Sequence, residues 1–71
     1  MKSTDQIKAI VKAGGSVIID SSRSTDQLKS IVKVAQENVQ VTIKNAEKKS
    51  TDQLKSIAKV ANCTVIFDLL G

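Results

Sequence analysis

The sequence predicts an α/β fold in which three tandem helix–strand repeats form a two-layer module. A parallel sheet of three strands, in the order 1-2-3, carries all of the helices on one face. The first observation is a repeated phrase: "STDQLKSI" occupies 24–31 and 50–57, and the related "STDQIKAI" occupies 3–10. The second is that each phrase precedes a short segment rich in β-branched residues. Self-similarity at such a period is typical of stacked repeats.

We therefore assign residues 1–71 to a single domain with the repeats 3–23, 24–49 and 50–71. Each repeat begins with a capping box, in which an N-cap serine and a glutamine three residues later bond each other's backbone amides. An aspartate in the first turn favours the same helix start, because the helix dipole is positive there. The predicted pairs are Ser3/Gln6, Ser24/Gln27 and Ser50/Gln53.

The apolar residues that follow each capping box are spaced three and four positions apart, which predicts one apolar stripe per helix. The stripes are Ile7, Ile10 and Val11; Leu28, Ile31, Val32 and Ala35; and Leu54, Ile57, Ala58 and Ala61. We expect the first helix to end at Gly14-Gly15, because glycine is the usual residue after a helix C-terminus. We expect the second to end near 36–38 and the third at Asn62.

The predicted strands are "SVIID" (16–20), "NVQVTIK" (38–44) and "CTVIFDLL" (63–70). Their alignment places Val17, Val41 and Val65 in register, 24 residues apart, with Ile19, Ile43 and Phe67 as further core positions. Cys63 matches a core-facing position and has no histidine partner. We interpret it as a small buried hydrophobe rather than a nucleophile.

Each strand–helix–strand connection must join parallel strands, and such crossovers are right-handed almost without exception. Two such connections in three successive units, with no reversal, place every helix on one face of the sheet and leave the other face bare. This plan resembles the α/β solenoids of the leucine-rich-repeat kind. The resemblance covers the helix-plus-strand unit and its period, and the leucine and asparagine pattern of that family is absent. In "VQVTIKNA", Asn45 lies at the wrong distance from Val41.

The bare sheet face carries the principal predicted interaction surface. Ile18, Thr42, Ile66 and Leu70 are its candidate interface residues. Parallel sheets are usually covered on both faces, so an exposed apolar row favours self-association. Two copies could stack face to face, or the unpaired edge strands could pair with those of another copy. Another protein is a further candidate partner.

A charged row, Asp20, Lys44 and Asp68, lies toward the carboxyl ends of the strands, where open α/β folds place their ligand sites. The two acids would lie about 9–10 Å apart across the middle strand, too far to share one metal ion. No histidine is present in the chain. We therefore expect a structural ladder rather than a catalytic site, no cofactor, and a protein that is not an enzyme.

Paired lysines at equivalent places in the three helices give an alternative function, the binding of a polyanion or nucleic acid. These candidate anion-binding residues are Lys8, Lys12, Lys29, Lys33, Lys55 and Lys59. The aspartates one turn earlier partly neutralise that face. Arg23 is the only arginine and Phe67 the only aromatic residue. The chain therefore has few side chains that could read base edges or stack on bases. We rank nucleic-acid binding below self-association.

Length and composition narrow the classes of protein that remain possible. A chain of 71 residues buries only about 60% of its unfolded surface, so small domains usually need an additional source of stability. One cysteine and no histidine exclude a disulfide and disfavour a metal site, which leaves association with another copy. The apolar runs fall short of the ~20 residues of a membrane span. With a net charge of +4, we expect a soluble cytoplasmic protein that acts as a structural or protein-interaction module.

Overall fold

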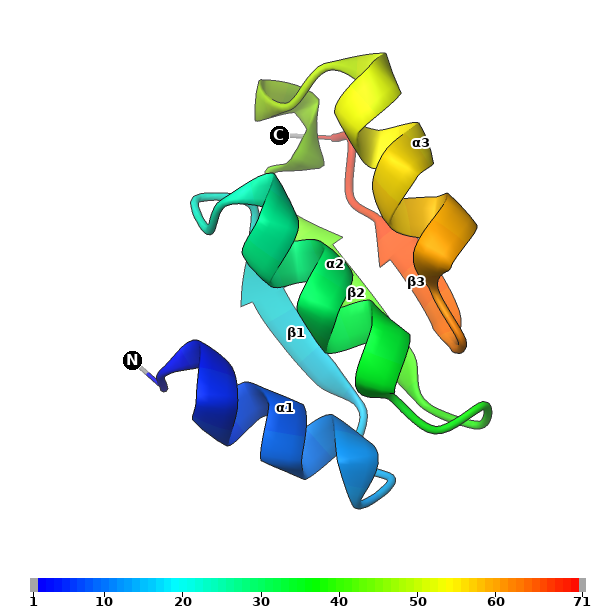
Figure 1. Cartoon of the computed structure of the whole chain (residues 1–71). Coiled ribbons are helices and arrows are strands. Elements are labelled where there is room, and N and C mark those ends of the chain that lie inside the picture. The colour runs from blue at the N-terminus through cyan, green and yellow to red at the C-terminus, as the bar shows by residue number, and fades with distance from the viewer. Residues whose placement is uncertain (1, 71) are drawn as a thin grey trace.

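A computed structural model describes residues 2–70 and contains three helix–strand units in succession (Figure 1). The α-helices are α1 (Thr4–Lys12), α2 (Thr25–Val34) and α3 (Thr51–Val60). The strands are β1 (Val17–Asp20), β2 (Gln40–Lys44) and β3 (Thr64–Phe67), and a short 3₁₀ helix, η1 (Ala46–Lys48), follows β2. The alternation of helix and strand confirms the predicted α/β module.

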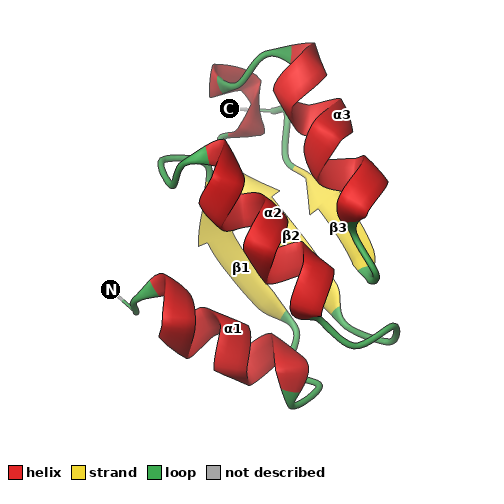
Figure 2. Cartoon of the chain, in the orientation of Figure 1, coloured by secondary structure: helices red, strands yellow, loops and turns green. Residues whose placement is uncertain are grey.

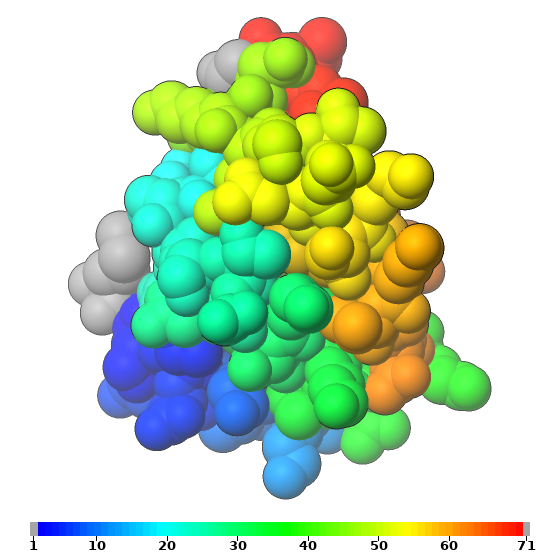
Figure 3. Space-filling model, turned by 45° about the horizontal axis from the view of Figure 1, so that its top comes forward, coloured from blue at the N-terminus to red at the C-terminus, as the bar shows by residue number. Residues whose placement is uncertain are grey.

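The three strands form one parallel sheet in the order β1-β2-β3, as predicted. The register is the one that sequence alignment predicted: Val41 pairs with Val17 on one side and Val65 on the other. All three α-helices lie on one side of this sheet (Figure 2). Viewed from that side, they form a continuous surface of adjacent side chains (Figure 3). No helix within residues 2–70 covers the opposite face of the sheet.

All three capping boxes are present, which explains why each α-helix begins where it does. In α2, the amide of Gln27 donates to the hydroxyl oxygen of Ser24 at 3.1 Å, and Ser24 N–H donates to the Gln27 side chain. The same reciprocal pair closes the first turn of α1 and α3. The repeated phrase is therefore a repeated helix start.

The C-cap of α1 lies directly before the predicted glycine pair, whereas α2 and α3 end slightly earlier than predicted, at Val34 and Val60. After α1, Gly14 has φ +99°, and the amide of Gly15 returns to the carbonyl of Ile10 at 3.0 Å. A Cβ on Gly15 would lie 2.8 Å from Cγ2 of Ile10, so the turn requires glycine. After α2 and α3, the chain continues in an extended conformation at Ala35 and Ala61.

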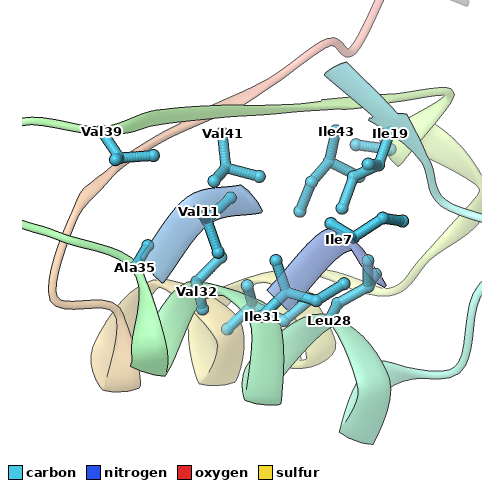
Figure 4. Close-up of a cluster of buried hydrophobic side chains, with 12 residues drawn as sticks. Ile7, Val11, Ile19, Leu28, Ile31, Val32, Ala35, Val39, Val41 and Ile43 are labelled. Carbon is cyan, nitrogen blue, oxygen red and sulfur yellow. The ribbon is translucent and has the colours of Figure 1, made fainter. Parts of the chain in front are cut away.

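The core lies between the helix layer and the sheet and is centred on the second repeat (Figure 4). Leu28, Ile31 and Val32 of α2 are completely buried, as are Val41 and Ile43 of β2. The matching residues of the third repeat are less enclosed, since the side chains of Val65 and Phe67 on β3 are only half-buried. Burial therefore falls from the middle of the array toward its ends.

Candidate functional site

The helix-free face of the sheet brings three of the four predicted interface residues into one row. The register pairs Ile18 with Thr42 and Thr42 with Ile66. Ile18 is 69% exposed and Ile66 is 42% exposed, with the half-buried Thr42 between them. Leu70 is 100% exposed, but β3 ends at Phe67, so strand alternation does not extend to Leu70.

The charged row lies at the carboxyl ends of the strands, where Asp20 ends β1, Lys44 ends β2 and Asp68 directly follows β3. Asp20 is opposite Lys44 in the register. The Asp20 carboxylate accepts hydrogen bonds from the Asn45 side chain at 2.6 Å and from the amide of Ser22 at 2.8 Å. The Asp68 carboxylate accepts from the amide of Leu70 at 3.0 Å. Each carboxylate thus accepts a hydrogen bond from the backbone amide two residues later in the chain.

Asn45 connects the first two repeats and was not identified from the sequence. Its backbone is left-handed, with φ 59°, and its side chain reaches Asp20. The hydroxyl of Ser21, which is 4% exposed, donates to the Asn45 carbonyl at 2.6 Å. An asparagine directly after a strand is a recognisable signal, because asparagine tolerates the left-handed conformation better than most residues.

The hydrogen bond from Asn45, together with those from Ser22, lowers the pKa of the Asp20 carboxyl, and Lys48 adds a smaller electrostatic effect. A carboxyl whose folded-state pKa lies below its ordinary value stabilises the fold above that ordinary value. This contribution is lost as the pH falls through the folded-state pKa. Asp20 therefore stabilises the fold in its ionised form.

We expect Asp20→Asn to lower the free energy of unfolding slightly at pH 7, because the charged acceptor for Asn45 and Ser22 is lost. The difference from wild type should shrink as the pH falls through the folded-state pKa of Asp20, because wild type is then also neutral there. Urea denaturation at several pH values from 7 to 2 measures the loss of unfolding free energy and its change with pH. A difference that stays constant with pH would show that the Asp20 charge plays no part.

Cys63 lies at the start of the third strand region and is half-buried, in line with the interpretation of it as a small hydrophobe. Its Sγ donates weakly to the Val32 carbonyl at 3.7 Å. Burial raises the pKa of the Cys63 thiol. A neutral thiol is a poor nucleophile, so the environment of Cys63 gives it a packing role.

A groove lies between α1 and the free edge of β1, and sequence reasoning did not anticipate it. Its volume is about 380 Å³. Its apolar lining comes from Ile7, Ile10, Val17, Ile18 and Ile19, and its polar lining from Lys2, Asp20, Ser22, Arg23 and Lys44. The groove exists because no strand within residues 2–70 pairs with the outer edge of β1.

The six predicted anion-binding lysines all lie on the helix layer, which is continuous across the three α-helices (Figure 3). Lys12, Lys33, Lys55 and Lys59 are exposed, whereas Lys8 and Lys29 are half-buried. The fold thus separates the two predicted surfaces. The lysines are on the helix side, and the row of Ile18, Thr42 and Ile66 is on the helix-free side.

Three further findings bear on the class of protein. Within residues 2–70, no group of three or more histidine, cysteine, aspartate or glutamate side chains is placed to hold a metal ion. None of the helices described is both long enough and apolar enough to cross a membrane. Comparisons of the chain with protein-family models, curated proteins and solved structures found no match.

Proposed function

We propose that this protein is a cytoplasmic structural or protein-interaction module that acts as a homo-oligomer through its bare sheet face or its edge strands. The observation that carries the proposal is the exposure of Ile18 and Ile66, at 69% and 42%, on the helix-free face of a parallel sheet. Parallel sheets are normally covered on both faces. An apolar row left open in this way is typical of an interaction surface.

A second copy of the chain is the occupant that the face favours. Both signs of charge lie at the carboxyl ends of the strands, with Asp20 ending β1, Lys44 ending β2 and Asp68 directly after β3. Two copies related by a twofold axis present the same surface to each other, so a face of mixed sign can oppose itself without a net like-charge repulsion. A domain of this size also gains stability from a partner.

We expect wild-type protein to show a mass above that of one chain when light scattering is combined with size-exclusion chromatography. If the bare face is the interface, Ile66→Lys and Ile18→Lys should each reduce that mass, because each places a charge in the apolar row. Thr64→Lys is a matched control, since Thr64 is exposed on the same strand and face as Ile66 but outside the apolar row. A wild-type mass of one chain at millimolar concentration would refute the proposal.

Polyanion binding through the lysines is the second candidate. The observation that favours it is that four of the six lysines are exposed on one continuous helix layer. Binding of this kind weakens steeply as salt rises, because it depends on counterion release. Salt-dependent binding of duplex DNA by a chain that remains monomeric would favour this candidate over self-association.

A further inference from the structure

Each repeat has an isoleucine at the same position of its helix, and the exposure of that isoleucine differs strongly between the repeats. Ile10, Ile31 and Ile57 occupy the same place in the repeated phrase, seven residues after the N-cap serine. Ile31 and Ile57 are completely buried, whereas Ile10 is 39% exposed. Ile31 and Ile57 each have a preceding repeat to pack against. Ile10 has none within residues 2–70, and it lines the groove beside β1.

At the other end of the array, the exposed position is one that faces a following repeat in the first two units. Val11 and Val32 occupy one position in their helices, and each is completely buried in a repeat that another repeat follows. The matching residue of α3 is Ala58, which is exposed. This position therefore faces the next repeat, and in α3 it faces outward. The two ends of the array expose the two halves of the contact that joins the repeats internally.

A side-chain hydrogen bond also recurs between successive repeats. Nη1 of Arg23, the residue before the second N-cap serine, donates to the hydroxyl of Thr4 at 3.0 Å. Lys49, the residue before the third N-cap serine, donates from Nζ to the hydroxyl of Thr25 at 3.4 Å. Lys2 and Thr51 occupy the corresponding places at the two ends. Both are exposed, and neither side chain bonds another side chain within residues 2–70.

The backbone hydrogen-bonding groups at the free edges of β3 and β1 are also complementary to each other. Ser21 N–H donates to the carbonyl of Lys44, so the backbone groups of the even-numbered residues of β1 point away from β2. Asp68 N–H donates to the carbonyl of Ile43, so the odd-numbered residues of β3 point to the free edge. Inside the chain, odd residues of one strand meet even residues of the next. The outer edges of β3 and β1 have the polarity to continue that pattern.

We propose that copies of this chain associate head to tail, so that β3 of one copy pairs in parallel with β1 of the next. The proposal rests on the proposed function and selects the edge strands over the bare face. Continued at the internal period, Val65 would pair with Val17 of the next copy, and Phe67 with Ile19. The β3 edge enters the groove beneath α1, and Ile10 becomes covered as Ile31 and Ile57 are.

The geometry of this contact determines the kind of assembly. The surface on one copy differs from the surface that it meets, so the interface is heterologous. Each copy retains one free end of each type, and repeated addition produces either a filament or a closed ring. Face-to-face stacking, by contrast, uses the same surface on both copies and ends at a dimer.

The test uses two variants of the whole chain, each blocking one end. Ile10→Lys places a charge in the groove, and Ala58→Lys places one on the opposite end of the array. Both positions are exposed in the single chain, so both variants should keep wild-type circular dichroism. The matched control is Ala9→Lys, an exposed α1 position beside Ile10 that does not line the groove.

We expect wild type and Ala9→Lys to increase in mass with concentration beyond a dimer. Each blocked variant alone should stay near one chain mass, with its self-association weakened at least tenfold. An equimolar mixture of Ile10→Lys and Ala58→Lys should form a 1:1 dimer, because each variant supplies the end that the other lacks. The double variant, which has no open end, should stay at one chain mass even when wild type is added, because it cannot join the wild-type assemblies.

The outcomes separate this inference from the proposed function. If the wild type assembles and both blocked variants assemble equally well, the head-to-tail contact is wrong and self-association stands. If both variants are monomeric and their mixture is also monomeric, the interface is not heterologous. A monomeric wild type overturns both proposals.

Amide hydrogen exchange provides a second measurement that does not depend on the variants. The amides of Ile18 and Val65 face the free edges of the sheet in the single chain, so they should exchange rapidly in dilute solution. At assembling concentration, both should slow at least tenfold. If the wild type assembles while both amides continue to exchange rapidly, the strand edges are not the interface.

Discussion

Ile43→Ala is expected to lower the free energy of unfolding by about 2–5 kcal/mol, the usual cost of truncating a buried isoleucine. Ile43 is completely buried on the central strand, with β1 on one side and β3 on the other. Its side chain points toward α2 from the middle of the core (Figure 4). A small domain has about 5–15 kcal/mol in total, so this variant removes a large share of its stability.

The neighbouring residue supplies the control for this experiment. Thr42 lies on the same strand but on the opposite, helix-free face, where it is half-buried. Thr42→Ala should therefore cost at most about 1 kcal/mol, mainly through the lower β-propensity of alanine. Urea denaturation followed by circular dichroism compares the two. Equal losses would mean that Ile43 is not enclosed between the sheet and the helices.

Ile31→Ala is expected to cost about 2–5 kcal/mol, and Ile10→Ala substantially less, although both remove the same atoms from the same repeat position. Ile31 is completely buried and Ile10 is 39% exposed. Truncation at Ile31 leaves a cavity between packed repeats, whereas truncation at Ile10 removes a side chain that water already reaches.

The comparison must be made in dilute solution, because the head-to-tail contact would cover Ile10. As the protein concentration rises, the loss at Ile10 should grow toward the loss at Ile31, since assembly adds the missing neighbour. Denaturation midpoints at several concentrations measure this change. Equal losses at the lowest concentration would contradict the burial difference between the first and second repeats.

The sequence by itself determined the repeats, the helix starts and the strand register. The serine and glutamine of each capping box are three residues apart, so their contact is local and does not depend on the rest of the fold. The register followed from aligning Val17, Val41 and Val65, because side chains alternate strictly along a strand and a shift of one residue would expose every core position. The handedness of the crossovers then placed the helices on one face.

The tertiary structure decided which members of each repeated set are buried. Ile10 and Ile31 lie in closely similar local sequences, yet the exposed fraction of the first is 39% and that of the second is zero. Burial depends on whether a neighbouring repeat is present, and no local pattern contains that information. Leu70 lies outside the row on the sheet face because β3 ends at Phe67. The reason is related, since a strand extends only as far as its neighbour continues to pair with it.

The turns were also decided by the three-dimensional fold. The connections between repeats differ in length, with the helix phrases 21 and 26 residues apart, so the period of the strands does not carry over to them. Asn45 meets Asp20 across that irregular region, and the groove beside β1 forms because α1 lies beyond the last paired strand. Local chemistry therefore determined each repeat, whereas contacts between repeats determined which surfaces remain open.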